Sequence, residues 1–194
     1  MNRELKVKKQ IEESAELKKA LTAQVDLLLK VADLMVQAFR EGNKVILFGN
    51  GGSAADAQHI AAELTGKFYL DRDPLPAIAL TTNTSSLTAM ANDYGFETIF
   101  SRQVKGLVRK GDVVIGISTS GDSINIIRGI GEAKRCGAVT IAFTGDRGKL
   151  RGLADYVLSV PSQDTPRIQE LHITAGHIIC YLVEQALFGE KEHE

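Results

Sequence analysis

Two side chains with acid–base chemistry lie four residues apart in a segment with a helical pattern. His59 and Glu63 are separated by about 40° around a helix axis and therefore share one face. Such a pair usually lies on a surface, but this one follows a glycine-rich loop by about one or two helical turns. Interconversion of an aldose and a ketose needs a base for the carbon-bound proton and an acid for the carbonyl oxygen. Glutamate and histidine suit these roles because burial can tune both toward neutral pH.

Two further candidates, Gln169 and His177, lie in the last predicted helix. They are about 80° apart around the axis and ~12 Å apart along it, whereas His172 lies roughly 140° from His177 and is expected to face elsewhere. Together with His59 and Glu63, these two residues could instead hold a zinc ion that polarises the carbonyl. The ~12 Å rise strains a site with one ion. The residues alone therefore leave both chemistries open.

Two small-residue loops predict where a phosphorylated ligand binds. Gly49-Asn50-Gly51-Gly52-Ser53 follows the apolar run 45–48, and Ser118-Thr119-Ser120-Gly121-Asp122-Ser123 follows the run 113–117. Small residues let the backbone approach an anion, and the helix after each loop points free N–H groups at it. A serine-rich helix cap is the simpler interpretation. Four hydroxyls in six residues nevertheless favour phosphate binding, with the Asp122 carboxylate pointing away from it.

The first loop also fits part of a dinucleotide-binding fingerprint. Gly49, Gly51 and Ala54 have the spacing G-x-G-x-x-A. That fingerprint expects an acidic residue at the end of the next strand, but here residues 81–83 are Thr-Thr-Asn, and Asp71 and Asp73 precede the strand. We therefore expect no nucleotide cofactor.

Alternating strand and helix patterns place these loops in an α/β fold. Strands are expected over 44–48, 76–80, 112–117, 138–143 and 156–160, and helices over 4–41, 53–65, 84–92, 97–108, 123–136, 147–153 and 166–188. Apolar strands separated by helices predict a doubly wound parallel sheet of five strands, with an extra N-terminal helix. In such a sheet, ligands bind at the carboxyl ends of strands where the strand order reverses, and both loops leave such ends.

Composition indicates one globular domain over 1–194. The chain is 44% hydrophobic and 24% charged, which is typical of a globular domain. Its net charge is −1, so we expect no basic surface and no nucleic-acid partner. We expect no signal peptide and no membrane partner, because no apolar run approaches the ~20 residues that span a bilayer. Cys136 and Cys180 have no CxxC partner and are expected to be reduced in a cytoplasmic protein.

The helical segment within 1–42 has an apolar stripe, which could pack against a second copy or against its own sheet. Residues 43–194 are expected to form the α/β core.

These residues together resemble the phosphoheptose isomerase (sedoheptulose 7-phosphate isomerase) family of sugar isomerase (SIS) domains, which has a flavodoxin-like fold. The likeness covers nearly the whole chain. It rests on the segments 49–53, 56–59, 63–66, 92–96, 100–102, 116–121 and 167–170, and on His177.

The resemblance implies a homotetramer with active sites at subunit interfaces. It implies interconversion of sedoheptulose 7-phosphate and D-glycero-D-manno-heptose 7-phosphate, the entry to bacterial surface heptose and lipopolysaccharide, with Glu63 as base and His177 as acid. It also implies one zinc ion per subunit, held by His59, Glu63, Gln169 and His177. The substrate contacts that it implies are Asn50, Gly51, Gly52, Ser53, Glu63, Asn92, Asp93, Ser118, Thr119, Ser120, Ser123 and Gln169.

Two positions depart from the family pattern. Pro166 stands where some members have an aspartate near the sugar, and Lys67 stands where others have arginine. The alternative is a non-catalytic relative, similar to the initiator-associating protein that binds the replication initiator DnaA. That relative lacks a histidine at the position of His177, so His177 favours the enzyme. A regulatory sugar-phosphate sensor would need a fused DNA-binding module, which does not fit in 194 residues.

Overall fold

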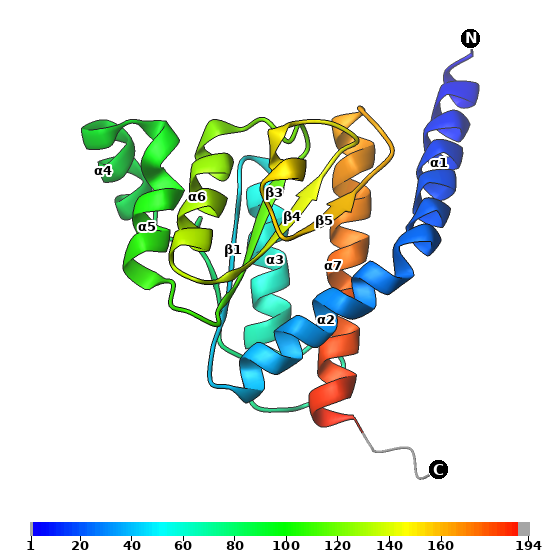
Figure 1. Ribbon diagram of the computed structural model, residues 1–194. Coiled ribbons are helices and arrows are strands. Elements are labelled where there is room, and N and C mark those ends of the chain that lie inside the picture. Colours follow the sequence, from blue (N-terminus) through cyan, green and yellow to red (C-terminus); the bar gives the residue numbers. More distant parts are fainter. Residues whose placement is uncertain (1, 190–194) are drawn as a thin grey trace.

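A computed structural model, which describes residues 2–189, shows a five-stranded parallel sheet with helices on both faces (Figure 1). The strands are β1 (Val45–Gly49), β2 (Ala77–Ala79), β3 (Val113–Ser118), β4 (Val139–Thr144) and β5 (Tyr156–Ser159). The α-helices are α1 (Arg3–Ala20), α2 (Val25–Arg40), α3 (Gly52–Thr65), α4 (Thr84–Tyr94), α5 (Ile99–Leu107), α6 (Ile124–Arg135) and α7 (Thr165–Phe188). Short 3-10 helices cover Leu21–Gln24, Phe96–Thr98 and Lys149–Gly152. The predicted doubly wound fold is confirmed.

The strand order is β2-β1-β3-β4-β5, so the order reverses between β1 and β3. These two strands pair in parallel along their whole length, from Val45 opposite Val113 to Gly49 opposite Ile117. The two small-residue loops leave the carboxyl ends of these two strands and therefore lie next to each other. This is the position at which doubly wound sheets bind ligands.

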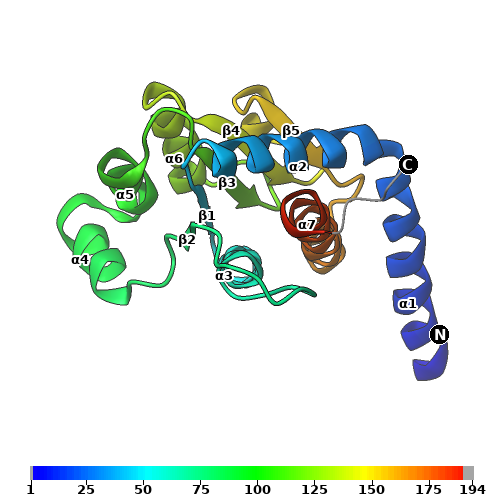
Figure 2. The same cartoon turned by 90° about the horizontal axis from the view of Figure 1, so that it is seen from below.

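Side chains of the strands alternate between two apolar layers. Val45 and Leu47 point into a core shared with α2, α3 and α7, whereas Ile46 and Phe48 point into a core shared with α5 and α6. Figure 2 shows these helices arranged around the sheet, with α3 and α7 close together. The alternation explains why the strands read as continuous apolar runs: both faces of the sheet are buried.

The N-terminal segment is not the single helix predicted over 4–41. It breaks at Leu21–Gln24 into a 3-10 turn, after which α2 runs across the sheet (Figure 1). The side chain of Gln24 donates to the carbonyl of Ser159 at 2.9 Å and accepts from its N–H at 3.1 Å, which ties the break to the edge strand β5. α2 packs on the sheet with Leu28, Val31 and Met35 buried, whereas α1 buries no residue.

The last helix, α7, is the one helix among residues 2–189 that is long and apolar enough to span a membrane by length and composition. Its apolar residues are interrupted by Glu170, His172, His177 and Glu184, so it holds no continuous apolar run of ~20 residues. A buried core helix passes the same test, and α7 packs against α2 and α3 with Ile168, Leu171 and Ala175 buried. Pro166 stands in its first turn, where its fixed φ suits a helix start.

Candidate active site

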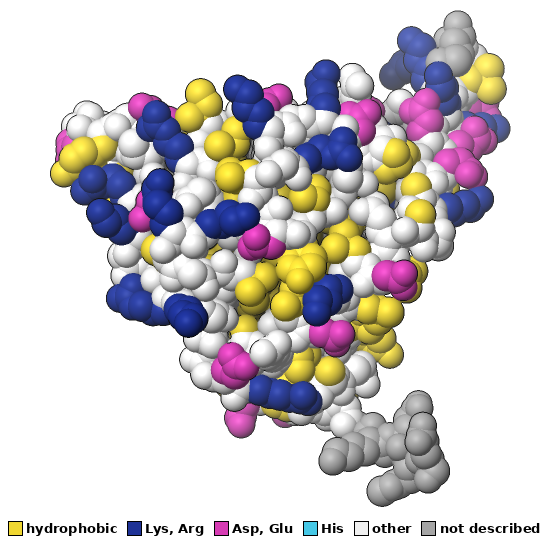
Figure 3. Space-filling view, in the orientation of Figure 1, with side chains coloured by type: hydrophobic (Ala, Val, Ile, Leu, Met, Phe, Trp, Pro, Cys, Tyr) yellow, Lys and Arg dark blue, Asp and Glu magenta, His cyan; other side chains and the backbone are white. Residues whose placement is uncertain are grey.

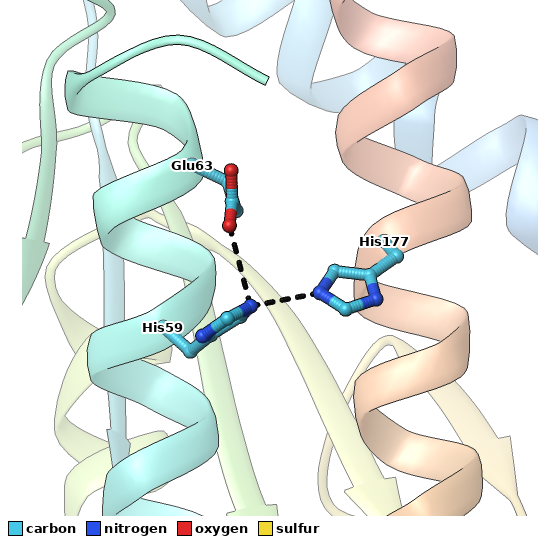
Figure 4. Close-up of side chains that lie close together, drawn as sticks. All are labelled: His59, Glu63 and His177. Atoms are coloured by element: carbon cyan, nitrogen blue, oxygen red, sulfur yellow. Dashed lines mark hydrogen bonds and ion pairs between the residues drawn. The ribbon is translucent and has the colours of Figure 1, made fainter. Parts of the chain in front are cut away.

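Three side chains from two helices meet beside the sheet. His59 and Glu63 project from one face of α3, and His177 projects toward them from α7 (Figure 4). The Nε2 atom of His59 lies 3.3 Å from the Glu63 carboxylate and 2.8 Å from Nε2 of His177. Glu63 is about three-quarters shielded from solvent, while His59 is half-exposed. Two imidazoles and one carboxylate are thus close enough together to contact one small ligand.

This cluster has the donor set and spacing of a metal centre. One ligand atom from each of His59, Glu63 and His177 lies within 4.8 Å of the other two. Two imidazoles and one carboxylate form a ligand set typical of catalytic zinc, which binds nitrogen at about 2.0–2.1 Å in tetrahedral geometry. That geometry separates two bound nitrogens by about 3.4 Å. The 2.8 Å between the two imidazoles would therefore need only a small widening, and the residues fit the ion.

The two loops at the carboxyl ends of β1 and β3 enclose a cavity of about 260 Å³. Its lining residues are Asn50, Gly51, Gly52, Ser53, Ile117, Ser118, Thr119, Ser123, Thr165 and Gln169. Most of the residues that were predicted to contact the phosphate therefore lie around this one cavity.

Hydroxyl groups in the second loop interact with one another and with the backbone. Ser118 donates to the hydroxyl of Ser123 at 3.0 Å. Ser120 is not part of the cavity lining; its hydroxyl accepts the N–H of Asp122 at 3.2 Å. The Asp122 carboxylate turns to the N–H of Lys149 at 3.1 Å, away from the ligand cavity as expected.

The first loop depends on glycine at two positions. Gly51 has φ +55°, a conformation that residues with a Cβ rarely adopt. A Cβ on Gly52 would lie within 3 Å of the side-chain amide of Gln169. Gln169 therefore lies against the loop, two turns of α7 before His177, and lines the cavity between the two loops. Its role as a metal ligand stays a prediction.

Asn125 is a site residue that the sequence interpretation missed. Its amide exchanges two hydrogen bonds with Asn50, at 2.9 and 2.8 Å, and its oxygen also accepts the N–H of Ile126. Asn125 is 3% exposed and Asn50 is partly exposed, so this pair is a partly buried link between the first loop and the start of α6. The sequence feature that could have indicated its role is a polar asparagine on the same face of α6 as the apolar Ile126 and Ile130.

Asp56 is a second missed residue, one turn before His59 on α3. Burial raises the pKa of its carboxyl to about 6, while the nearby His59 acts in the opposite direction. One of its oxygens is buried without a hydrogen-bond partner among the described residues.

Three other residues lie apart from the cluster. Asn92 and Asp93 are exposed at the end of α4, where their side chains bond to each other at 2.8 Å. His172 is fully buried and its Nε2 lies 3.3 Å from the carbonyl of Thr144. Burial lowers the pKa of His172 to about 4, although the hydrogen bond with Thr144 acts to raise it. The expectation that His172 faces away from His177 is therefore confirmed.

The fold and the paired loops define a sugar isomerase domain, and the SIS domain family matches residues 10–145. Within that class, the chain belongs to the phosphoheptose isomerase family. It is 60% identical to the phosphoheptose isomerase of Aquifex aeolicus over 93% of this chain and 95% of that protein. It is 53% identical to that of Burkholderia pseudomallei over 98% of this chain and 99% of that protein.

Solved structures agree with this assignment. The phosphoheptose isomerase of Neisseria gonorrhoeae superposes with a TM-score of 0.90 and 43% identity, covering 95% of this chain and all of that chain. The resemblance inferred from the motifs is confirmed, and the chain is a sugar-phosphate isomerase. Nothing in these likenesses supports the alternative of a non-catalytic protein that binds DnaA.

Proposed function

We propose that this isomerase interconverts sedoheptulose 7-phosphate and D-glycero-D-manno-heptose 7-phosphate, the first step of bacterial heptose synthesis for lipopolysaccharide. The observation that carries the proposal is the approach of Glu63 and His177 from separate helices, close to a cavity lined by backbone amides and hydroxyls. A phosphate held in that cavity would leave the other end of an extended seven-carbon chain free to reach the cluster. Its relatives are named for this substrate class.

Proton transfer by these two residues accounts for the reaction. Glu63 takes a proton from C1 of the ketose while His177 donates a proton to the oxygen at C2, which gives an enediol. The enediol then returns the O1 proton to His177, and Glu63 delivers its proton to C2, which gives the aldose. Each residue ends in its starting state, and both are within reach of one ligand, as general acid–base catalysis requires.

We also propose that the same cluster binds one zinc ion per subunit. His59, Glu63 and His177 would hold it, and Gln169 remains a candidate fourth ligand. A bound zinc ion would polarise the carbonyl oxygen of the substrate. The support for this proposal is the spacing of the three ligand atoms and their chemistry.

A homotetramer with active sites between subunits is the proposed assembly. α1 buries none of its residues, yet it exposes Leu5, Val7 and Ile11, and α2 exposes Val25 and Leu29. Figure 3 shows hydrophobic side chains among the charged ones over this side of the molecule. A second copy covering these helices would bury that surface. Light scattering on the purified protein tests the expected mass of four chains.

Contacts from another subunit would also explain Asn92 and Asp93. Both are exposed and lie apart from the cluster within one chain, so their predicted contact with the sugar depends on the assembly. Lys67, which follows α3, and Pro166 are the positions where sugar recognition would differ from other family members. We propose action in the cytoplasm, in keeping with the two free thiols of Cys136 and Cys180.

The test is conversion of sedoheptulose 7-phosphate followed by NMR. We expect the aldose to appear with the unaltered protein, and Glu63→Gln and His177→Asn to lose at least a hundredfold in kcat. The control is Glu41→Gln, which changes an exposed carboxylate bonded to Gln37 at the end of α2 and should leave kcat unchanged. Near-normal turnover in either active-site variant would show that the roles are wrongly assigned. Absence of the aldose with the unaltered protein would reject the substrate.

A further inference from the structure

A buried ion pair joins the ends of the two helices that carry the acid and the base. Arg72, in the segment after α3, donates from Nε to the carboxylate of Glu184 on α7 at 3.2 Å. The side chains are 3% and 1% exposed. Burying two charges is costly unless both are fully hydrogen-bonded, so the remaining partners of the pair show what it holds in place.

The guanidinium of Arg72 caps the end of α3. It donates to the carbonyl of Glu63 at 2.9 Å, to that of Leu64 at 2.8 Å and to that of Gly66 at 3.1 Å. Glu63 and Leu64 belong to the last turn of α3 and Gly66 follows it, so their carbonyls have no partner within the helix. One of them is the carbonyl of the proposed base itself. Arg72 therefore fixes the backbone from which the Glu63 carboxylate projects.

The carboxylate of Glu184 holds the loop that follows α3. It accepts the N–H groups of Phe68 at 3.1 Å, Tyr69 at 2.8 Å and Leu70 at 3.1 Å. Burial acts to raise the pKa of Glu184, but these N–H groups and Arg72 outweigh it and hold the pKa below its usual value. The ionised form of the Glu184 carboxyl is thus the form that binds these N–H groups.

The loop held by Glu184 contacts the proposed acid. The ring of Phe68 lies 5.8 Å from the ring of His177, centre to centre. Glu184 is seven residues after His177, which is two helical turns and about 20° around α7, so both project from one face. The pair thus contacts the surroundings of the base through Arg72 and those of the acid through Phe68.

We propose that Arg72 and Glu184 are positioning residues of the isomerase, which set the relative placement of Glu63 and His177. This inference rests on the proposed roles of those two residues. It predicts an effect on turnover, because reacting groups displaced by about 1 Å can lose on the order of a hundredfold in rate. The phosphate cavity lies at the other end of α3 and has no contact with the pair, so substrate affinity should change little.

The chain offers a matched control at the amino ends of the central strands β1 and β3. Asp112, 1% exposed, binds Nζ of Lys44 at 2.6 Å and accepts the N–H groups of Lys44 and Arg109. Asp112 and Lys44 precede β3 and β1, whereas the active-site loops follow these strands. Asp112→Asn therefore disturbs a buried ion pair of similar construction without touching the acid or the base.

The experiment compares Arg72→Lys, Glu184→Gln and Asp112→Asn in the full chain, with melting temperatures and circular dichroism to confirm folding. We expect kcat to fall between about ten- and a hundredfold in the first two variants, with KM within about twofold, and to stay unchanged in Asp112→Asn. Phe68→Leu should reproduce part of the loss if the variants at Glu184 fold poorly. Unchanged kcat in folded Arg72→Lys and Glu184→Gln would overturn the proposal. An equal loss in Asp112→Asn would overturn it too, because the effect would then be one of general stability.

A second readout separates this inference from the proposed function. The ring protons of His177 should shift in the NMR spectrum of substrate-free Glu184→Gln, because the Phe68 ring moves relative to them. They should not shift in Asp112→Asn. If the unaltered protein failed to convert sedoheptulose 7-phosphate, the substrate would be wrong, and a shift of the His177 signals would still support positioning. No shift would overturn it.

Discussion

The link between Asn50 and Asn125 predicts strong coupling between two residues that are 75 positions apart in the chain. Two reciprocal hydrogen bonds of 2.9 and 2.8 Å join their side chains. A neutral hydrogen bond contributes about 1 kcal/mol net, and an orphaned buried partner costs about 1–3 kcal/mol. Asn50→Ala leaves the buried amide of Asn125 unpaired and should lower the free energy of unfolding by about 2–3 kcal/mol. Asn125→Ala should cost about 1–2 kcal/mol, because the partly exposed Asn50 can bond to water instead.

The double variant separates the link from other contacts. It removes both partners, so it should cost about 2 kcal/mol less than the sum of the single variants. Urea unfolding of all four proteins gives this coupling. An exposed pair with a bond of similar length, Gln37 and Glu41 at 2.9 Å, is the control and should show only a few tenths of a kcal/mol. Additive costs at Asn50 and Asn125, within about 0.5 kcal/mol, would refute the reasoning.

Three further predictions concern the loop, the metal and a buried histidine. Gly52→Ala should raise KM at least fivefold because its Cβ meets Gln169, whereas Gly131→Ala, with open space at its Cβ, should not; equal KM values would contradict this. A chelator should lower activity and zinc restore it, and full activity in metal-free protein would reject the zinc site. The third prediction concerns His172, whose pKa is about 4 in the folded protein and 6.5 in its ordinary state. Between pH 4 and 6.5, the imidazole therefore binds a proton in the unfolded chain but not in the folded one. The free energy of unfolding should therefore fall by about 3 kcal/mol from pH 6.5 to 4. This loss should be smaller in His172→Gln, and identical pH profiles would contradict it.

The sequence predicted those parts of the site that depend on residues close together in the chain. Each small-residue loop is set by its own sequence after an apolar strand, and the parallel sheet then brings the two loops together. The shared face of His59 and Glu63 follows from helix geometry alone. Sequence spacing did not predict that His177 would lie against His59, because the packing of α3 on α7 decides it.

The missed features depend on contacts between residues far apart in the chain. Gln24 breaks the N-terminal helix because it bonds to Ser159, which is 135 residues away. Asn125 reads as an ordinary helix residue until Asn50 is beside it. Arg72 and Glu184 are 112 residues apart in the chain, and only the fold shows that both are buried against each other. Tertiary partners of this kind leave no periodic signal in one sequence.

Deuterium incorporation tests the central claim most directly, because it follows the carbon-bound proton that Glu63 is proposed to carry. Sedoheptulose 7-phosphate is incubated with the protein in D₂O, and the aldose is analysed by NMR. Proton transfer by a carboxylate that exchanges with solvent predicts deuterium at C2 of the aldose. It also predicts that Glu63→Gln, with substrate binding intact, incorporates none into either sugar. Normal incorporation by Glu63→Gln, with the aldose formed at the unaltered rate, would contradict the account.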